Sequence, residues 1–527
     1  MRDPTFLAPS FIMFINDIKI SAAALFFIFL HLYYPRFRSL YKFGETIVKN
    51  KIISVVFVSA LFSSAAFAVT ANHHKLLKGN TDNLTVRTAS LEQQVQKLQN
   101  EITSLKKPAK KESGNYFDTD LLVEMYAHGP AVVTSPAMGV RRSAEDASDL
   151  TVNLSSVNED ILLLKTRKDM DNYALKNGIK VPERPVIYLS GGVEGEVSYA
   201  NRYKYYGAEK TDINLARAEV DVIAEASPWA TAAMIVSYDD SSDSCRRIDN
   251  SRLKLDRGFL TIGQLNKLPL YFTIGQIYAP FGSYSTDMVT DPSTKKLGRF
   301  KDRMAVLGYY WEGLSAQIYG YPGETLGSKN ALEHAGFNLG YDYTKDEFKI
   351  GVGASIIGNL GESDGIQDAV FVQKTYPSNE RMAHRVAGIS GRAKVHYHPF
   401  TVRAEYVGAL RKFDASDMQF NNVGARPQAL QVEGLYEFNF LNRTNNFVVG
   451  YGHTWEALAM KLPKDSFFGE YKIAVVKNAI LSLEYRHDIN YGKDDTAMAK
   501  GTEVRVAGAN ITGRHKDTIT ANIGIYF

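Results

Sequence analysis

The last segment of the chain, residues 517–527, restricts its possible folds more than any other stretch. Apolar or small residues occupy every second position from Ile519 to Phe527. Polar or small residues stand between them, and Tyr526 is the exception. This period-two alternation predicts a β-strand with one apolar face. Such a strand must pair with neighbouring strands and find an apolar environment for that face.

Four further segments alternate in the same manner, at 212–226, 391–398, 400–407 and 481–488. The charged faces of these segments contain Arg217, Glu219, Asp221, Arg392, Lys394, Arg403, Glu405, Glu484 and Arg486. A soluble β-sandwich and a transmembrane β-barrel both produce this alternation, but the barrel turns its apolar face to lipid and its charged face to the lumen. In a barrel, these charged residues are therefore candidates for the lumen wall.

Short and long connections alternate along residues 186–527. Short turns are predicted at 227–228, 266–269, 312–313, 344–347, 398–399, 442–446 and 477–478. Long loops are predicted at 201–211, 240–254, 280–303, 322–331, 358–385, 411–426, 457–468 and 489–502. Seven turns and eight loops separate sixteen strands, and an even number is what a single-chain bacterial barrel requires. The parity predicts that 517–527 is the closing strand and pairs with the strand that begins near Val186.

An alternating last strand that ends in an aromatic residue is typical of bacterial outer-membrane β-barrels. The sequence therefore predicts an all-β transmembrane barrel of about 16 antiparallel strands with both ends in the periplasm. Sixteen strands leave an aqueous channel unless something plugs it. Residues 503–512 also read as a strand, yet this count leaves them no position.

The N-terminal region contains a secretory signal peptide at 48–68. Lys49-Asn50-Lys51 is a short basic stretch, an apolar run follows from Ile52 to Phe62, and Ala66-Phe67-Ala68 predicts cleavage after Ala68. Because 48 residues precede the basic stretch of so clear a signal, we interpret 1–47 as an upstream extension and expect translation to begin at Val48. A genuine membrane anchor through residues 11–32 is the alternative.

Residues 69–107 carry a leucine heptad. Its core positions are Leu77, Leu84, Leu91, Val95, Leu98, Ile102 and Leu105. The remaining faces are almost wholly polar, so a lone helix has no apolar partner, and the pattern predicts a coiled coil that joins copies of this protein. Burial of the leucines within one molecule is the alternative. Val and Ile at a with Leu at d favour two strands in isolated peptides, but threonine at a weakens this preference. An attached barrel of trimeric type can override it, and we expect a homotrimer.

A linker and a separate module follow the heptad. Pro108 and the lysines around it end the helix and make a solvated linker over 108–115. Residues 116–185 do not read as barrel, and Ser156 with Glu159 predicts a capping box at the start of a helix that extends to Tyr173. This module fits a plug inside the lumen or a periplasmic cap equally well.

Composition excludes several classes of protein. Charged residues form 22% of the sequence and the mean hydropathy is −0.21, so a bundle of transmembrane helices is excluded. The net charge of +4 is too small on this length to indicate nucleic acid as a partner. Cys245 is the single cysteine, and no cysteine–histidine cluster, phosphate-binding loop or nucleophile–base pair is detectable. His396 and His398, two positions apart on one strand face, could bind a metal, but we interpret them as polar residues that face the lumen. We therefore expect no enzyme, no metal and no cofactor.

The third long loop is the best candidate for a pore constriction, because charged groups at a constriction select the permeant solute. Its charged residues are Asp287, Asp291, Lys295, Lys296, Arg299, Lys301 and Arg303. The cationic second half of the loop favours anionic solutes. The alternative is that these charges are merely solvated on an outer loop.

The order of segments, with His128-Gly129-Pro130, Ser156-Val157-Asn158-Glu159-Asp160 and Ala279-Pro280-Phe281-Gly282-Ser283-Tyr284, resembles the siderophore porins of the legiobactin-receptor type. More distantly, the sequence is similar to trimeric porins with an N-terminal periplasmic coiled coil. The resemblance covers residues 69–527 and implies uptake of a ferric siderophore across the outer membrane without a TonB-type plug receptor. It carries over no ligand-contact residue.

Three hypotheses of function follow from the sequence. The first is a TonB-independent siderophore porin of the outer membrane, with outer-membrane lipid and a ferric siderophore as partners. The second is a passive diffusion porin for small, anionic solutes. The third is a structural or adhesive envelope protein whose coiled coil engages the cell wall.

Overall fold

The computed structural model describes most of the protein from residue 157 to the C-terminus, together with a short segment before it. The described residues are 132–134, 157–178, 181, 184–201, 210–239, 252–323, 332–345, 347–371, 382–441, 443–476, 479–499 and 513–527. The predicted upstream extension, signal peptide, coiled coil and linker lie outside these residues, and so does the unplaced segment Glu503–Thr512. All of the described residues belong to one compact unit.

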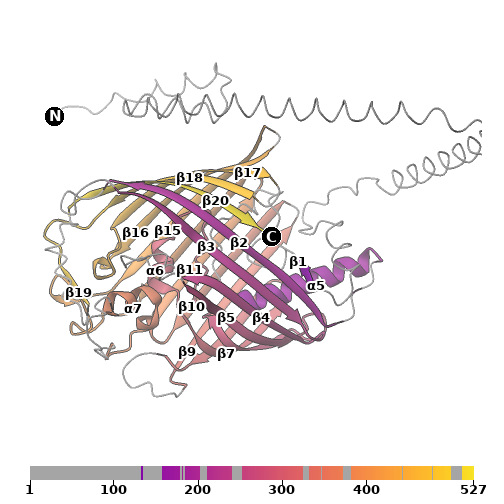
Figure 1. Cartoon of the computed structure of the whole chain (residues 1–527). Coiled ribbons are helices and arrows are strands. Elements are labelled where there is room, and N and C mark those ends of the chain that lie inside the picture. The colour runs from indigo at the N-terminus through magenta and orange to yellow at the C-terminus, as the bar shows by residue number, and fades with distance from the viewer. Residues whose placement is uncertain are drawn as a thin grey trace, which may run out of the picture. The chain divides into compact units, whose positions relative to one another are not determined.

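Sixteen antiparallel strands form the wall of a closed barrel (Figure 1). They are β2 (Val186–Ala200), β3 (Lys210–Glu225), β4 (Ala230–Asp239), β5 (Arg252–Gly263), β6 (Leu270–Tyr278), β7 (Lys301–Trp311), β8 (Leu314–Tyr321), β9 (His334–Lys345), β10 (Phe348–Ile357), β11 (Gly388–Tyr397), β12 (Phe400–Ala409), β15 (Gln428–Phe440), β16 (Arg443–Trp455), β17 (Asp465–Val476), β18 (Ala479–Ile489) and β20 (His515–Tyr526). Each strand pairs with the next wall strand in sequence order. The predicted number of strands is confirmed.

The first and last strands of the wall close the barrel. β20 pairs antiparallel with β2 from Gly192–Tyr526 to Ala200–Thr518, and on its other edge with β18. Phe527 extends this ladder, since its backbone N–H and C=O both bond to Gly191 at 3.0 and 2.8 Å. Beyond the end of β20, the short strand β1 (Val132–Thr134) pairs parallel with Ile187–Leu189 of β2. Periodicity does not predict β1, because three residues are too few to show a period.

Short elements lie in the long connections. They are α6 (Ser293–Gly298), η3 (Leu360–Glu362), α7 (Asp364–Phe371), η4 (Leu458–Met460), and a small sheet of β13 (Met418–Phe420), β14 (Val423–Gly424) and β19 (Ala497–Ala499). The short turns are all at the opposite end of the barrel. We call these two ends the loop end and the turn end.

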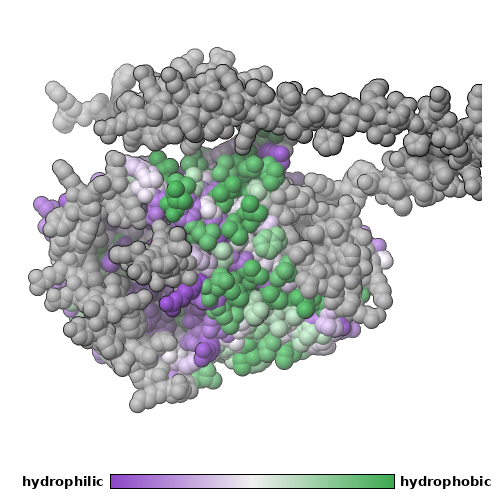
Figure 2. Space-filling model, in the orientation of Figure 1, coloured by the Kyte–Doolittle hydropathy of each residue, from purple (hydrophilic) through white to green (hydrophobic). Residues whose placement is uncertain are grey.

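The outer surface of the barrel is apolar. Along β20, Ile519, Ile523 and Ile525 are exposed while their neighbours Thr520 and Asn522 are buried against the interior. The same inversion holds for Leu481 and Leu483 of β18 against Ser482 and Glu484. Figure 2 shows hydrophobic side chains gathered in a band across the visible side of the wall. An apolar exterior with a polar interior is the arrangement of a barrel surrounded by lipid.

Aromatic residues mark the turn-end edge of this band. Pairs of rings pack between neighbouring strands there, with Phe348 against Tyr397 and Phe400 against Tyr436 at centroid distances of 6.5 and 5.2 Å. Aromatic side chains are amphipathic enough to sit at the interface between hydrocarbon and water. Among the described residues, no helix is both long and apolar enough to cross a membrane.

One helix, α5 (Glu159–Lys176), lies against the inner wall at the turn end (Figure 1). The predicted helix 156–173 is therefore displaced by three residues at each end. Its N-cap is Asn158, which has a left-handed backbone (φ 62°) and makes no capping hydrogen bond through its side chain. Asn tolerates that conformation well, which allows the helix to begin directly after it. Ser156 of the predicted capping box lies outside the described residues.

The apolar belt generates a first prediction. Ile523→Arg places a charge near the middle of the lipid-facing side of β20, where Ile523 is 52% exposed. We expect the free energy of unfolding to fall by roughly 2–4 kcal/mol, the cost of an arginine at the bilayer midplane. Reversible denaturant unfolding in lipid vesicles measures it.

The matched control is Leu332→Arg, because Leu332 is 73% exposed in a connection ahead of β9 rather than on the wall. A change of about 0.5 kcal/mol or less is expected there, as for an ordinary surface substitution. Equal costs at both positions would contradict a lipid-facing β20.

Candidate functional site

The connection between β6 and β7, residues 279–300, folds into the barrel; we call it the inner loop. Its path begins with a turn at Gly282, which has φ 76° and donates its N–H to Ser355 Oγ of β10 at 2.9 Å. A Cβ at this position would meet the Tyr284 ring at 2.4 Å. Glycine is therefore required both by the backbone conformation and by the close approach of the ring.

Four glutamates of the inner wall hold the inner loop by accepting hydrogen bonds from successive loop residues. Glu405 of β12 accepts the N–H groups of Ser283 and Tyr284 at 2.6 and 2.7 Å. Glu433 of β15 accepts the Asp287 N–H at 3.0 Å and the Thr286 hydroxyl. Further bonds run from Val289 N–H to Glu470 of β17 at 2.8 Å and from Thr290 N–H and Oγ1 to Glu484 of β18 at 3.0 and 2.7 Å.

These contacts fix the course of the inner loop across the barrel. The glutamates stand on β12, β15, β17 and β18, so the loop follows the wall over that arc. Hydrogen bonds to a charged acceptor are stronger than neutral ones, and each carboxylate satisfies backbone donors that would otherwise be buried without a partner. The inner loop is therefore an ordered structural element of the lumen.

An opening of about 410 Å³ lies between the inner loop and the remaining wall. Its wall side comes from β2, β3, β18 and β20, and its loop side from Val289 to Lys296. The charged residues that line it are Glu194, Glu196, Arg217, Asp291, Lys295, Lys296 and Arg486. Five of these were predicted from the sequence, two as lumen residues and three as constriction residues.

A β-bulge places two adjacent residues of β3 at the opening. The register of β2 against β3 shifts between Glu194–Arg217 and Gly195–Leu215, so Ala216 is an extra residue. Ala216 and Arg217 consequently both line the opening, although strict alternation would turn one of them to lipid. Alternation predicts Ala216 on the apolar face, and this prediction is wrong because of the bulge.

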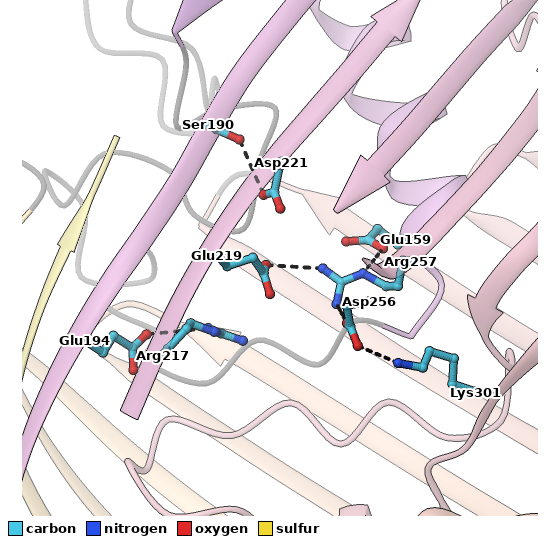
Figure 3. Close-up of polar contacts among 9 residues, drawn as sticks. All are labelled: Glu159, Ser190, Glu194, Arg217, Glu219, Asp221, Asp256, Arg257 and Lys301. Atoms are coloured by element: carbon cyan, nitrogen blue, oxygen red, sulfur yellow. Dashed lines mark hydrogen bonds and ion pairs between the residues drawn. The ribbon is translucent and has the colours of Figure 1, made fainter. Parts of the chain in front are cut away.

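Ion pairs balance part of the charge at the opening. Arg217 Nη1 lies 3.5 Å from Glu194 Oε1 (Figure 3), and Lys295 Nζ lies 2.5 Å from Asp291 Oδ1. Burial lowers the pKa of the Lys295 ammonium, and the neighbouring Asp291 opposes this effect. Arg486 binds Asp488 at 2.7 Å and lies over the Phe468 ring at 5.0 Å. The opening therefore presents charges of both signs.

The other predicted constriction residues lie away from the opening. Asp287 forms an ion pair with Arg403, and Arg299 lies 3.6 Å from Asp364 and 4.5 Å from the Tyr278 ring centroid. Lys301 and Arg303 belong to β7 rather than to the loop, and Lys301 binds Asp256 at 2.5 Å. Most of the predicted cationic segment is thus paired with carboxylates.

The remaining predicted lumen residues also lie on the inner face, where they contact other residues of the barrel wall. Arg392 donates to Asn338 at 2.9 Å, and Lys394 follows on the same face nearer the turn end, opposite Arg403. Glu219 binds Arg257 at 3.2 Å, and Asp221 accepts from Ser190 at 3.4 Å (Figure 3).

Sequence reasoning missed several residues of the site: Glu194, Glu196, Glu433, Glu470 and Arg257. Glu433 and Glu470 stand at inward positions of alternating strands, so alternation alone was a sufficient signal for their direction. Nothing in the sequence shows that a loop donates backbone bonds to them. Across the described part of the protein, no group of three or more His, Cys, Asp or Glu is arranged to hold a metal ion.

A closed barrel with an apolar exterior and a lumen narrowed by an inner loop defines a porin-like transmembrane β-barrel. This fold supports a channel function and a location in the outer membrane. A UPF0422 protein of Coxiella burnetii is 32% identical over 477 residues, which cover 89% of this chain and 97% of that protein. The chain therefore belongs to the UPF0422 family.

Other comparisons give a further relative by sequence and several distant likenesses among solved structures. A UPF0422 protein of Legionella pneumophila subsp. pneumophila is 36% identical over 435 residues, covering 79% of this chain and 81% of that protein. Among solved structures, the outer membrane channel DcaP of Acinetobacter baumannii has a TM-score of 0.43 at 13% identity over 65% of this chain and 97% of its own. The anion-selective porin from Comamonas acidovorans has a TM-score of 0.41 at 10% identity, over 65% and 100%. No protein-family model matches the sequence.

The glutamate contacts generate a second prediction. Glu433→Ala removes the acceptor of two inner-loop donors and a partner of Arg403. A hydrogen bond to a charged group contributes about 1.5–3 kcal/mol, so local release of the loop should become at least about tenfold more frequent. Limited trypsin digestion, which cuts after Lys295 and Lys296, measures the rate of nicking in the folded barrel.

Glu347→Ala is the control, since Glu347 is exposed in the short turn between β9 and β10. It should leave the digestion rate unchanged. An unchanged rate in Glu433→Ala as well would show that Glu433 does not hold the loop.

Proposed function

We propose that this protein is an outer-membrane channel that admits a ferric siderophore without a TonB-type plug receptor. The single observation that supports a channel is the charged opening of about 410 Å³ between the inner loop and the wall of a closed barrel. Loop and wall together give a constriction whose side chains meet the solute, and such side chains set selectivity. The siderophore as solute rests on the family resemblance of the sequence motifs described above.

A passive diffusion porin for small solutes is the second candidate. The mixed charges at the opening favour it, because Glu194, Glu196 and Asp291 stand beside Arg217, Lys295, Lys296 and Arg486. With four basic and three acidic side chains, we expect a slight preference for anions. Homo-oligomerisation through the coiled coil and the barrel, with a trimer favoured, is part of the proposal and is tested by light scattering of the detergent-solubilised protein.

Conductance measurements on refolded protein in planar bilayers distinguish the two candidate functions. A siderophore channel should show a conductance that ferric siderophore reduces in a saturable manner, because the bound ligand occupies the opening. A diffusion porin should show a conductance indifferent to ferric siderophore. A protein with no conductance under any condition would refute both.

The opening generates a third prediction. Lys296→Glu replaces a cation that lines the opening, and we expect the anion-to-cation permeability ratio to fall by roughly twofold or more. Reversal potentials in a salt gradient measure this ratio. Lys412→Glu, an equal change of charge at an exposed position in the loop-end connection after β12, should leave it unaltered. The same ratio in both variants would remove Lys296 from the permeation path.

A further inference from the structure

We propose that α5 is an internal plug that fills the sector of the lumen lined by β3–β9 and confines permeation to the opening beside the inner loop. This inference rests on the channel function proposed above. It goes beyond that function, because it assigns a role in pore size to a segment that precedes the barrel in the sequence.

Polar contacts fasten the N-terminal half of α5 to the wall. At its N-terminal end, Asp160 Oδ2 accepts the Thr273 hydroxyl of β6 at 2.9 Å. Near its middle, Arg167 donates to Thr231 Oγ1 of β4 at 2.7 Å and to the Gly263 carbonyl of β5 at 2.5 Å. Gly263 ends β5 at the turn end, so the helix enters there with its N-terminus deepest.

The N-terminal end of α5 contacts a buried cluster of charged residues. Glu159 of α5 lies 2.8 Å from Arg257 of β5, which also contacts Glu219 of β3 and Asp256 at 3.2 and 2.7 Å (Figure 3). A bulge in β5, opposite Ile235 and Val236, turns both Asp256 and Arg257 inward. Burial raises the pKa of Glu159 to about 7, although Arg257 opposes this effect. Such a cluster is costly unless every charge keeps its partners, which favours a helix that stays docked.

Apolar packing supports the same conclusion. Leu163 and Met170 join a core with Ile223, Ala233 and Phe259, which point inward from β3, β4 and β5. Ile161 and Leu164 pack on Tyr271 of β6. A water-filled lumen would not carry apolar residues on its wall, so this part of the wall is built to be covered.

The covered sector and the opening lie on different strands except for β3, which contributes to both. The direct polar contacts of α5 reach from β4, where Arg167 binds Thr231 at 2.7 Å, to β9, where Lys165 binds Asp342 at 2.9 Å. Arg257 links Glu159 of the helix to Glu219 of β3. The inner loop occupies the arc from β10 to β18. The opening uses β18, β20, β2 and β3. Helix and loop therefore obstruct two different sectors, and the third is left for the solute.

Two leucines of the same helix provide a matched pair of variants. Leu164 is 1% exposed at the wall, whereas Leu162 is 49% exposed. Leu164→Asp buries a carboxylate that has no partner and should release α5, while Leu162→Asp should not. In planar bilayers we expect Leu164→Asp to raise single-channel conductance by roughly twofold or more, since an unobstructed barrel of this size is an aqueous channel. Equal conductance in Leu164→Asp and wild type would overturn the plug.

Thiol labelling tests the plug without relying on conduction. In a Cys245→Ser background, Thr273→Cys lies beneath α5, and Glu196→Cys lies in the opening. A membrane-impermeant thiol reagent should label Thr273→Cys slowly while α5 is intact and at the rate of Glu196→Cys once Leu164→Asp is added. Rapid labelling of Thr273→Cys with intact α5 would refute the plug.

The two measurements keep the proposals separate. If no variant conducts, the channel function fails, and labelling still decides whether α5 covers the wall. If wild type conducts but neither measurement responds to Leu164→Asp, the plug alone fails. Should Leu164→Asp not insert into membranes, Arg167→Ala provides a milder release, because it removes the contacts with Thr231 and Gly263.

Discussion

Every backbone donor and acceptor in a membrane must find a partner within the protein, and this constraint dictates the architecture. A sheet in lipid can satisfy it only by closing on itself. Here β20 and β2 make that closure, and Phe527 and Gly191 extend their ladder. The apolar outer face and the polar inner face of each strand follow directly, since closure assigns one face of the sheet to lipid and the other to the lumen.

Closure of sixteen strands also creates an interior that is too wide for the wall side chains to fill, and here other segments occupy part of this lumen. The inner loop is held in the lumen by specific polar contacts with the wall. The inner loop is suspended from carboxylates on β12, β15, β17 and β18, and its backbone amides replace the water that would otherwise solvate them. In the channel proposed above, selectivity depends in part on these wall carboxylates, because they position the loop that carries Asp291, Lys295 and Lys296.

Much of the barrel could be predicted from the sequence, because a period of two is a local signal and its phase tells the direction of each side chain. The turns, the loops and the closing strand follow from counting. What could not be predicted depends on contacts between segments distant in the sequence. Glu405 reads as one more lumen charge, yet it holds Ser283 and Tyr284, and only the fold brings them together. Bulges at Ala216 and Asp256 break the alternation, and no residue type signals an inserted position there.

The pairing of β2 with β20 has a consequence for how the protein assembles. The two strands are separated by almost the whole barrel sequence, so the ring cannot be completed before the final residues arrive. Contacts between residues this distant in the sequence make folding slow, because the entropy cost of closing a long loop comes before the stabilising contacts form. Until then the nascent sheet has two unpaired edges of the kind that aggregate. A protein that lacks β20 would therefore keep two open strand edges, and it would be prone to aggregate as well as unable to close its barrel.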